Sequence, residues 1–318
     1  MDVITIGESM ILFTPITTGP MRYKSNFESK VGGAESNVAI GLSRLEHKVG
    51  WISRLGNDEF GKKILTFIRG EGVDVSQVAL DSVNNTGLYF KEIVRDNEVN
   101  VHYYRKNSAA SFLKPSDLNK TYLAGAKYLH VTGITPILSE TCYQTIKSAI
   151  DIAKENGVQV VFDPNIRKKL WSNEEDSKKI LLEIAANSDI VLPGIEEGKF
   201  LSNETTPENI AKFFYDIGVS VVVLKLGEKG AYYHQEDDKG YVAPFPVKKV
   251  IDPIGAGDGF AAGFLSGLLD GLGIYEAVKR GAAIGSIVTT VEGDVEGLPD
   301  RDQLYAFLSR IEREDVHR

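Results

Sequence analysis

Cysteine is almost absent from this chain of 318 residues, since Cys142 is the only one. A single cysteine excludes a disulfide framework and any metal site built from cysteines. The five histidines are scattered, and no two stand at a spacing typical of metal ligands. Basic residues are fewer than acidic ones: the chain has 36 Lys and Arg but 44 Asp and Glu, which gives a net charge of −8. Bulk electrostatics therefore give no attraction to nucleic acid or to an anionic membrane surface.

The chain also lacks an apolar run long enough to cross a bilayer. Its first seven residues show neither a basic leader nor a long apolar segment, so we expect a cytoplasmic protein. Three motifs are missing as well: the Walker A loop, a Gly-x-Gly-x-x-Gly after the first strand, and the Gly-x-Ser-x-Gly elbow. These absences disfavour P-loop enzymes, Rossmann dinucleotide-binding proteins and α/β-hydrolases.

What is present is the composition of a large globular protein, 42% hydrophobic and 25% charged. Apolar runs predict strands at residues 3–8, 49–56, 127–133, 158–163, 190–192 and 219–226. Helical patterns follow Gly33, Phe60, Ser139 (an N-cap), Asn173, Ile195 and the Thr206-Pro207 pair. This alternation predicts an α/β fold with a mostly parallel central sheet and helices on both faces. The length allows one domain with an insertion, or two domains.

Shorter alternating stretches indicate a second, smaller sheet. Residues 11–13 and 22–27 read as antiparallel strands, and residues 86–94 and 99–106 as a hairpin with its turn at 95–98. A further turn is expected at 237–240, between strands 231–234 and 241–243. We therefore predict a β lid of residues 9–29 and 85–106 beside a main domain of residues 1–8, 30–84 and 107–318. Because its edges need covering, such a sheet would make either a lid or the face of a homo-oligomer, a dimer or higher.

The stretch with the most chemistry is residues 252–263, where Asp252 and Pro253 lead into Gly255, Ala256, Gly257 and Asp258. A turn of small residues that opens a helix gathers backbone N–H groups and the positive end of the helix dipole, which attracts an anion such as phosphate. A carboxylate beside it suits a base that deprotonates an attacking hydroxyl. A plain tight turn with Asp258 as a helix cap explains the same pattern equally well.

Other candidates follow the ends of predicted strands, where ligands bind in α/β sheets. They are Arg167, Lys225 with Gly227 and Gly230, and the Gly255 turn itself, which follows a third apolar stretch. Each also has an ordinary structural explanation: a surface arginine, a strand-end lysine that reaches solvent, and simple turns. Tyr103 and Arg105 also have an ordinary structural explanation, which is packing within a strand with the charge directed outward. Glu196 and Glu197 could hold Mg²⁺ through water or merely match the helix dipole.

Residues 32–39 and 252–263 resemble the first and second signatures of the ribokinase-like (PfkB) carbohydrate kinases, in the expected order. Residues 87–89, 103–106, 163–167 and 292–294 look like those of the family members that phosphorylate 2-keto-3-deoxygluconate. The resemblance implies a ribokinase-like fold with a β lid, and transfer of phosphate from ATP to the C6 hydroxyl of that sugar acid, with Mg²⁺. It leaves a monovalent cation open as an additional activator.

The resemblance also implies roles for single residues. Asp258 would be the base, and Gly255, Ala256 and Gly257 would form the anion hole. Lys225, Gly227 and Gly230, together with Gly255 and Gly257, would bind the nucleotide, and Glu197 would act on Mg²⁺ through water. The sugar-acid ligands would be Gly33, Tyr89, Tyr103, Arg105, Arg167 and Asp294, with Asn37 as a weaker candidate.

One position departs from the family pattern, because Gly194 stands where the family commonly has an Asn three residues before a Glu. The arginines fit a substrate carboxylate, whereas a neutral sugar needs hydroxyl partners. The alternatives are a family kinase for fructose, ribose or a nucleoside, a glycosidase acting on nucleoside phosphates, or a silent sugar sensor. The partners expected are therefore a small sugar acid and ATP, with no nucleic acid and no membrane.

Overall fold

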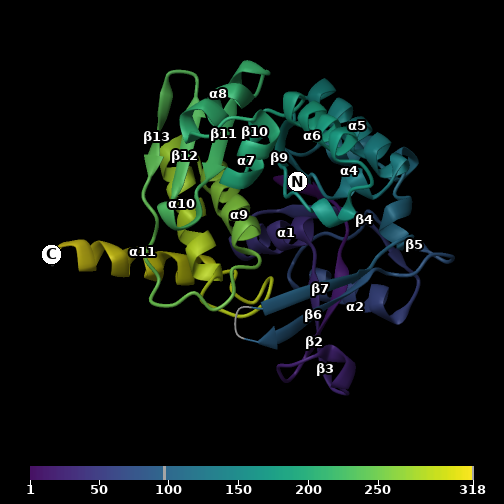
Figure 1. The fold of residues 1–318 in the computed structure, drawn as a ribbon. Coiled ribbons are helices and arrows are strands. Elements are labelled where there is room, and N and C mark those ends of the chain that lie inside the picture. Colours follow the sequence, from purple (N-terminus) through teal and green to yellow (C-terminus); the bar gives the residue numbers. More distant parts are fainter. Residues whose placement is uncertain (96–97, 317–318) are drawn as a thin grey trace.

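The computed structural model describes residues 1–95 and 98–316, with side chains described as far as Arg310. Nine strands form one large sheet in the order β13-β12-β11-β10-β9-β8-β1-β4-β5 (Figure 1). Every neighbouring pair from β11 to β5 is parallel, and only the pairs β11–β12 and β12–β13 at one edge are antiparallel. The predicted α/β fold with a mostly parallel sheet is confirmed.

The elements of the main domain have the following bounds. Its strands are β1 Val3–Ile6, β4 Val49–Gly56, β5 Val78–Asp81, β8 Tyr128–Thr132, β9 Gln159–Asp163, β10 Ile190–Val191, β11 Val221–Lys225, β12 Ala231–Gln235 and β13 Asp238–Val242. Its α-helices are α1 Ala34–Arg44, α2 Glu59–Gly70, α3 Lys120–Ala124, α4 Thr135–Leu138, α5 Glu140–Glu155, α6 Glu174–Ala186, α7 Ile195–Ser202, α8 Pro207–Asp216, α9 Ala256–Leu269, α10 Ile274–Val288 and α11 Arg301–Val316. Short 3-10 helices are η2 Ala109–Phe112, η3 Pro115–Asp117, η4 Lys168–Leu170 and η5 Gly227–Lys229.

Alternate side chains of the strands supply two cores, one on each face of the large sheet. In β9, Val161 packs into the core shared with α1, α2, α9 and α10, whereas Val160 and Phe162 pack into the core shared with α5 to α8. Successive strand side chains point to opposite faces, so a run without polar residues is required where both faces are covered. This explains why the three central residues of β9, Val160 to Phe162, are all apolar.

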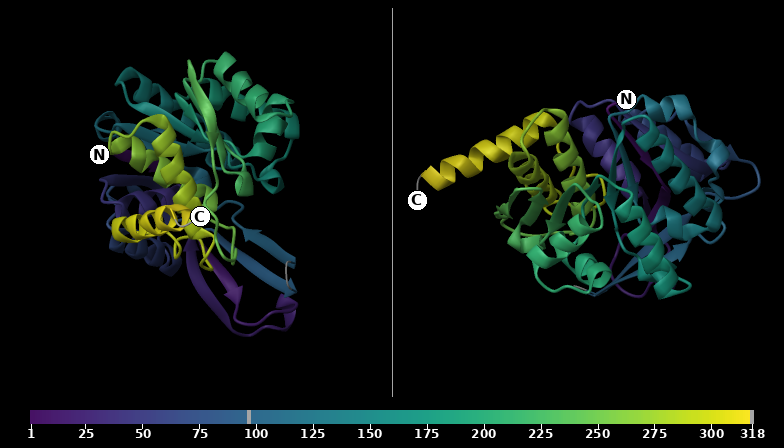
Figure 2. Two further views of the ribbon diagram at one scale, coloured as in Figure 1. Left: turned by 90° about the vertical axis from the view of Figure 1, so that its left-hand side faces the viewer. Right: turned by 90° about the horizontal axis from the view of Figure 1, so that it is seen from above.

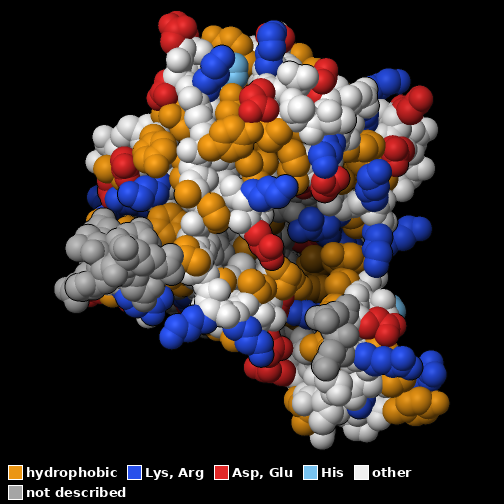
Figure 3. Space-filling model, turned by 60° about the vertical axis from the view of Figure 1, so that its left-hand side comes forward, with side chains coloured by type: hydrophobic (Ala, Val, Ile, Leu, Met, Phe, Trp, Pro, Cys, Tyr) orange, Lys and Arg blue, Asp and Glu red, His pale blue; other side chains and the backbone are white. Residues whose placement is uncertain are grey.

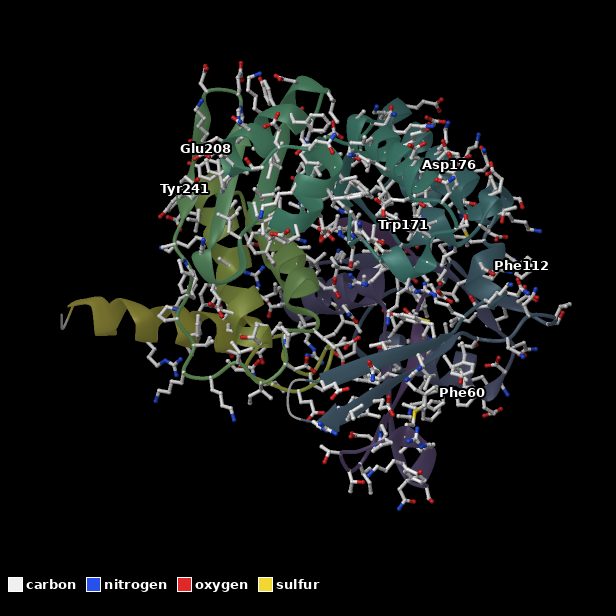
Figure 4. All side chains as sticks on the ribbon, in the orientation of Figure 1. Phe60, Phe112, Trp171, Asp176, Glu208 and Tyr241 are labelled. Atoms are coloured by element: carbon white, nitrogen blue, oxygen red, sulfur yellow. The ribbon has the colours of Figure 1, made fainter. Side chains whose placement is uncertain are left out.

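Helix caps fix where several helices begin. The Ser139 side chain accepts a hydrogen bond from the Cys142 N–H at the start of α5, and Thr206 accepts one from the Asn209 N–H at the start of α8. Both caps were predicted, because a hydroxyl at this position satisfies an N–H that lacks an intrahelical partner. The Tyr241 hydroxyl of β13 also donates to Glu208 of α8 at 2.6 Å, which ties the edge strand to this helix (Figure 4).

The second sheet, which we call the lid, has the order β3-β2-β6-β7 and projects from one side of the main domain (Figure 2). Its strands are β2 Met10–Pro15, β3 Phe27–Gly32, β6 Leu88–Arg95 and β7 Glu98–Tyr104, with a 3-10 helix η1 at Met21–Tyr23. Aromatic side chains cover its outer face, where Phe60 of α2 packs edge-on against Phe13 at 5.8 Å (Figure 4). The predicted hairpin is present as the antiparallel pair β6 and β7, but Asp96 and Asn97 of its turn lie outside the described residues.

Three local predictions were wrong. Residues 22–27 do not form a strand: Pro20 starts a 3-10 turn, in which the Tyr23 N–H donates to the Pro20 carbonyl, and β3 begins only at Phe27. The turn expected at 237–240 is shorter, because β13 begins at Asp238 and Gly240 pairs with Tyr233. Residues 243–255 contain no strand, so the Gly255 turn follows a loop.

The division into main domain and lid stays a prediction. Strand β3 of the lid continues to Gly32, beyond the lid boundary predicted after residue 29.

Candidate active site

A cavity of about 690 Å³ lies between the lid and the carboxyl ends of the main strands. The space-filling view shows the hollow between the two parts, with basic and acidic side chains at its mouth (Figure 3). Most of the residues singled out in the sequence line it: Gly33, Asn37, Tyr89, Tyr103, Arg105, Arg167, Glu197, Lys225, Gly227, Gly255, Gly257, Asp258 and Asp294. Ala256 and Gly230 do not line it.

The turn at Gly255 has the geometry expected of an anion site. Gly255 has φ of 78°, and a Cβ there would lie 2.5 Å from the Asp294 carbonyl oxygen, so only glycine fits. Helix α9 begins at the next residue, and its first N–H groups have no intrahelical partner. A partial positive charge therefore accumulates where the cavity meets this turn.

Asp258 lies in the first turn of α9 and is held by a residue from α1. The Asn37 side-chain amide donates to Oδ2 of Asp258 at 2.8 Å, which leaves Oδ1 of the carboxylate available to a ligand. Burial raises the pKa of Asp258 to about 7, with help from the nearby charges of Asp163 and Asp294, although the Asn37 bond and Arg167 oppose the rise. A carboxylate with a pKa near neutrality is matched to accepting a proton at physiological pH.

Asp294 forms a second polar point in the cavity. It accepts a hydrogen bond of 3.1 Å from the hydroxyl of Tyr89, which comes from β6 of the lid. Burial raises the pKa of Asp294 to about 6, while the Tyr89 bond and Lys91 oppose the rise. The ring of Tyr89 stacks on that of Tyr103 at 5.9 Å. Lid and main domain thus share a wall rich in hydroxyl and carboxylate groups, as sugar hydroxyls require.

Lys225 ends β11 and points toward the same turn. Its Nζ lies 2.6 Å from Oδ2 of Asp163, at the end of β9. Burial alone would lower the pKa of Lys225, but the carboxylates of Asp163, Glu197 and Asp258 raise it above the ordinary value. The ammonium therefore stays charged next to the anion site. Gly230, in the same loop, has φ of 85°, and a Cβ there would lie 2.0 Å from the Val242 carbonyl.

The two arginines predicted to bind a carboxylate differ in their surroundings. Arg105 is buried and forms an ion pair with Glu8, which also accepts a hydrogen bond from Ser108. Its Nε is buried and has no hydrogen-bond partner among the described residues. Arg167 is exposed at the cavity, and no described carboxylate lies within ion-pair distance of it. Arg167 is thus the cation more open to an incoming anion.

Glu197 occupies the N-terminal turn of α7. Its Oε2 accepts from the Gly194 N–H and its Oε1 from the Ile166 N–H, both at 2.7 Å. Each oxygen keeps one lone pair for a water molecule. The described residues contain no group of three or more His, Cys, Asp or Glu side chains that could hold a metal ion alone. This donor set fits Mg²⁺ held mainly by phosphates and water with one or two carboxylates.

Several residues of this site were missed or left without a role in the sequence analysis. Asp163, Glu8 and Lys91 make ion pairs at the cavity, and the sequence assigned none of them. For Lys91 a signal existed: it stands two residues after Tyr89 in one strand, so both side chains lie on the same face. Asn37 was a weaker candidate, yet its buried Oδ1 lacks a partner among the described residues and can accept from a ligand hydroxyl.

A phosphoryl-transfer site of the sugar-kinase class requires a place for an anion, a carboxylate able to accept a proton and exclusion of water. The helix N-terminus at Gly255, the carboxylate of Asp258 and the second sheet beside the cavity fit these requirements. The family model for pfkB carbohydrate kinases matches residues 1–301, and the chain belongs to this family. It is a sugar kinase. Among the described residues, none of the helices has the length and apolarity to span a bilayer.

Two curated relatives and one solved structure illustrate the similarity. A 2-dehydro-3-deoxygluconokinase of Bacillus subtilis is 42% identical over 97% of this chain and 96% of its own length. A 5-dehydro-2-deoxygluconokinase of Lacticaseibacillus casei is 32% identical over 99% of this chain and 98% of its own. A structure assigned as a ribokinase II of E. coli, in complex with ATP and Mg²⁺, is 27% identical with a TM-score of 0.91, covering 97% of this chain and 99% of that one.

Proposed function

We propose that this kinase transfers the terminal phosphate of ATP to the C6 hydroxyl of 2-keto-3-deoxygluconate. The observation that carries the proposal is one cavity with a cation open to a carboxylate, Arg167, and a poised base, Asp258. A neutral sugar would leave that guanidinium without an anionic partner. The 42% identity to a 2-dehydro-3-deoxygluconokinase supports the same substrate.

In the proposed reaction, the sugar-acid carboxylate binds Arg167 and the Nε edge of Arg105, and its hydroxyls contact Tyr103 and Asp294. The C6 hydroxyl then faces the free oxygen of Asp258. That carboxylate accepts the hydroxyl proton as the new O–P bond forms, and the bond to ADP breaks. Afterwards Asp258 returns its proton to solvent.

The phosphate being transferred would be stabilised by the N–H groups at the start of α9 and by the Lys225 ammonium. Residues Gly227 and Gly230 belong to the loop that follows β11, where we place the nucleotide. Glu197 and Asp163 are the carboxylates that would hold Mg²⁺ through water, and the ion supplies neutralisation of phosphate charge. Closure of the lid excludes water, which would otherwise compete with the sugar as acceptor.

The test is ADP release measured with a panel of acceptors at equal concentration: 2-keto-3-deoxygluconate, 5-keto-2-deoxygluconate, fructose, ribose and a nucleoside. We expect the highest kcat/KM with 2-keto-3-deoxygluconate and a phosphate on C6 of the product by ³¹P NMR. A higher kcat/KM with fructose or 5-keto-2-deoxygluconate would reassign the substrate.

A further inference from the structure

A buried ion pair joins the lid to the segment that leads into the Gly255 turn. The Nζ of Lys91, on lid strand β6, lies 2.6 Å from Oδ2 of Asp252. Their side chains are only 10% and 7% exposed. A buried charge is strongly unfavourable without its partner, so the position of each group depends on the other.

The second oxygen of Asp252 extends this connection toward the turn. Oδ1 of Asp252 accepts a hydrogen bond of 3.1 Å from the Ile254 N–H, and Gly255 follows directly. The backbone on the other side is anchored as well, since the Ile251 N–H donates to the Thr289 carbonyl at 2.8 Å. The Asp252 carboxylate is therefore the link between a lid side chain and the backbone that starts α9.

We propose that Lys91 is a positioning residue for phosphoryl transfer, which through Asp252 holds the Gly255 turn in the shape that binds the transferring phosphate. The inference rests on the proposed function, because it assigns phosphoryl transfer to this turn. When β6 of the lid moves away from the main domain, Asp252 loses its cation, and the Gly255 turn loses the contact that holds it. Transfer to water is then suppressed until a bound sugar brings the lid, and Lys91, into place.

A second lid lysine offers a matched control. Lys30 of β3 lies 3.5 Å from Glu296, with side chains 20% and 37% exposed. This pair also links the lid to the main domain, but neither partner bonds to the residues that form the Gly255 turn. Partly exposed pairs of this kind contribute little, so the Lys30→Met variant should retain the turnover of the parent within about twofold.

The experiment compares Lys91→Met, the neutral double variant Lys91→Met/Asp252→Asn, and Lys30→Met. We expect Lys91→Met to lower kcat at least tenfold while KM for ATP and for the sugar acid changes less than threefold. The double variant leaves no buried unpaired charge, so it keeps the parent's thermal stability. The double variant still lacks the Lys91 contact, so its kcat should remain at least tenfold below that of the parent.

Two kinetic results would each overturn the proposal. One is a double variant with parental kcat, since the pair would then only balance charge. The other is Lys91→Met within twofold of the parent. Hydrogen exchange of the peptide spanning residues 252–258 supplies a readout without turnover: we expect faster exchange in Lys91→Met and parental exchange in Lys30→Met. If the parent phosphorylates no acceptor, the proposed function fails, and unchanged exchange in Lys91→Met separately refutes the link.

Discussion

Replacing Asp258 by Asn removes the proposed base and keeps its shape. Asn37 can still donate to the oxygen of the new amide, so the local hydrogen bond survives. Positioned bases contribute roughly 10²–10⁴-fold, and we therefore expect kcat to fall about 10³-fold. The affinity for ATP should not change, because the nucleotide contacts proposed here come from Lys225 and the backbone.

The same substitution should stabilise the folded protein at high pH. Burial raises the pKa of Asp258 from 3.8 to about 7, so the folded state holds this proton more tightly than the unfolded state does. Below pH 3.8 both states are protonated and the carboxylate has no effect. Its destabilising effect grows between pH 3.8 and 7 and reaches about 4 kcal/mol above pH 7. Asn carries no charge, so the variant should gain up to that amount at pH 8 and little at pH 4.

Three measurements check this prediction: ADP release, ATP titration calorimetry, and urea unfolding at pH 4 and pH 8. Asp151→Asn is the matched control, because Asp151 is exposed on α5 and does not line the cavity. Near-parental turnover of Asp258→Asn would refute the role of base. A slow variant that gains no more stability over the parent at pH 8 than at pH 4 would refute the argument from burial.

Further predictions concern the same cavity. The kcat/KM of the parent should rise about tenfold per pH unit below pH 7 and level off above it, because Asp258 must be ionised; a flat profile from pH 5 to 8 would contradict this. Arg167→Ala should raise KM for the sugar acid at least tenfold and leave KM for ATP within twofold, and equal effects on both would argue against a carboxylate contact. Arg105→Ala should also lower the melting temperature in a thermal scan, since it leaves the Glu8 carboxylate buried without its cation. Gly255→Ala should abolish measurable ADP release while circular dichroism stays parental, because its Cβ would meet the Asp294 carbonyl at 2.5 Å.

Much of the fold could be predicted because its elements carry local signals. The mostly apolar segment of β4 and the caps at Ser139 and Thr206 depend on neighbours a few residues away, and each was placed correctly. The strand expected at residues 22–27 failed for a local reason too, since Pro20 started a 3-10 turn that the alternation of residues concealed.

The site was predictable in part, through the two glycine turns and the family signatures that contain them. Arg105 shows the limit of this approach. From the sequence it is predicted to be a cation for a substrate carboxylate, and that role stays a prediction. The sequence did not show that the fold brings Glu8 against one edge of the guanidinium and leaves Nε without a partner among the described residues. The sequence gives the type of each side chain, whereas the electrostatic environment of that side chain depends on which distant residues the fold brings next to it.

The sequence by itself therefore determined the class of protein: the strand and helix order, the small-residue turn that starts α9, and the acidic residue beside it. Only the tertiary structure decided what these parts do together. Asn37 and Asp258 are 221 positions apart, and Lys91 and Asp252 are 161 positions apart, yet each pair is in contact. The physical reason is burial: loss of water around these groups raises the pKa of Asp258 and makes the Lys91–Asp252 ion pair depend on exact placement.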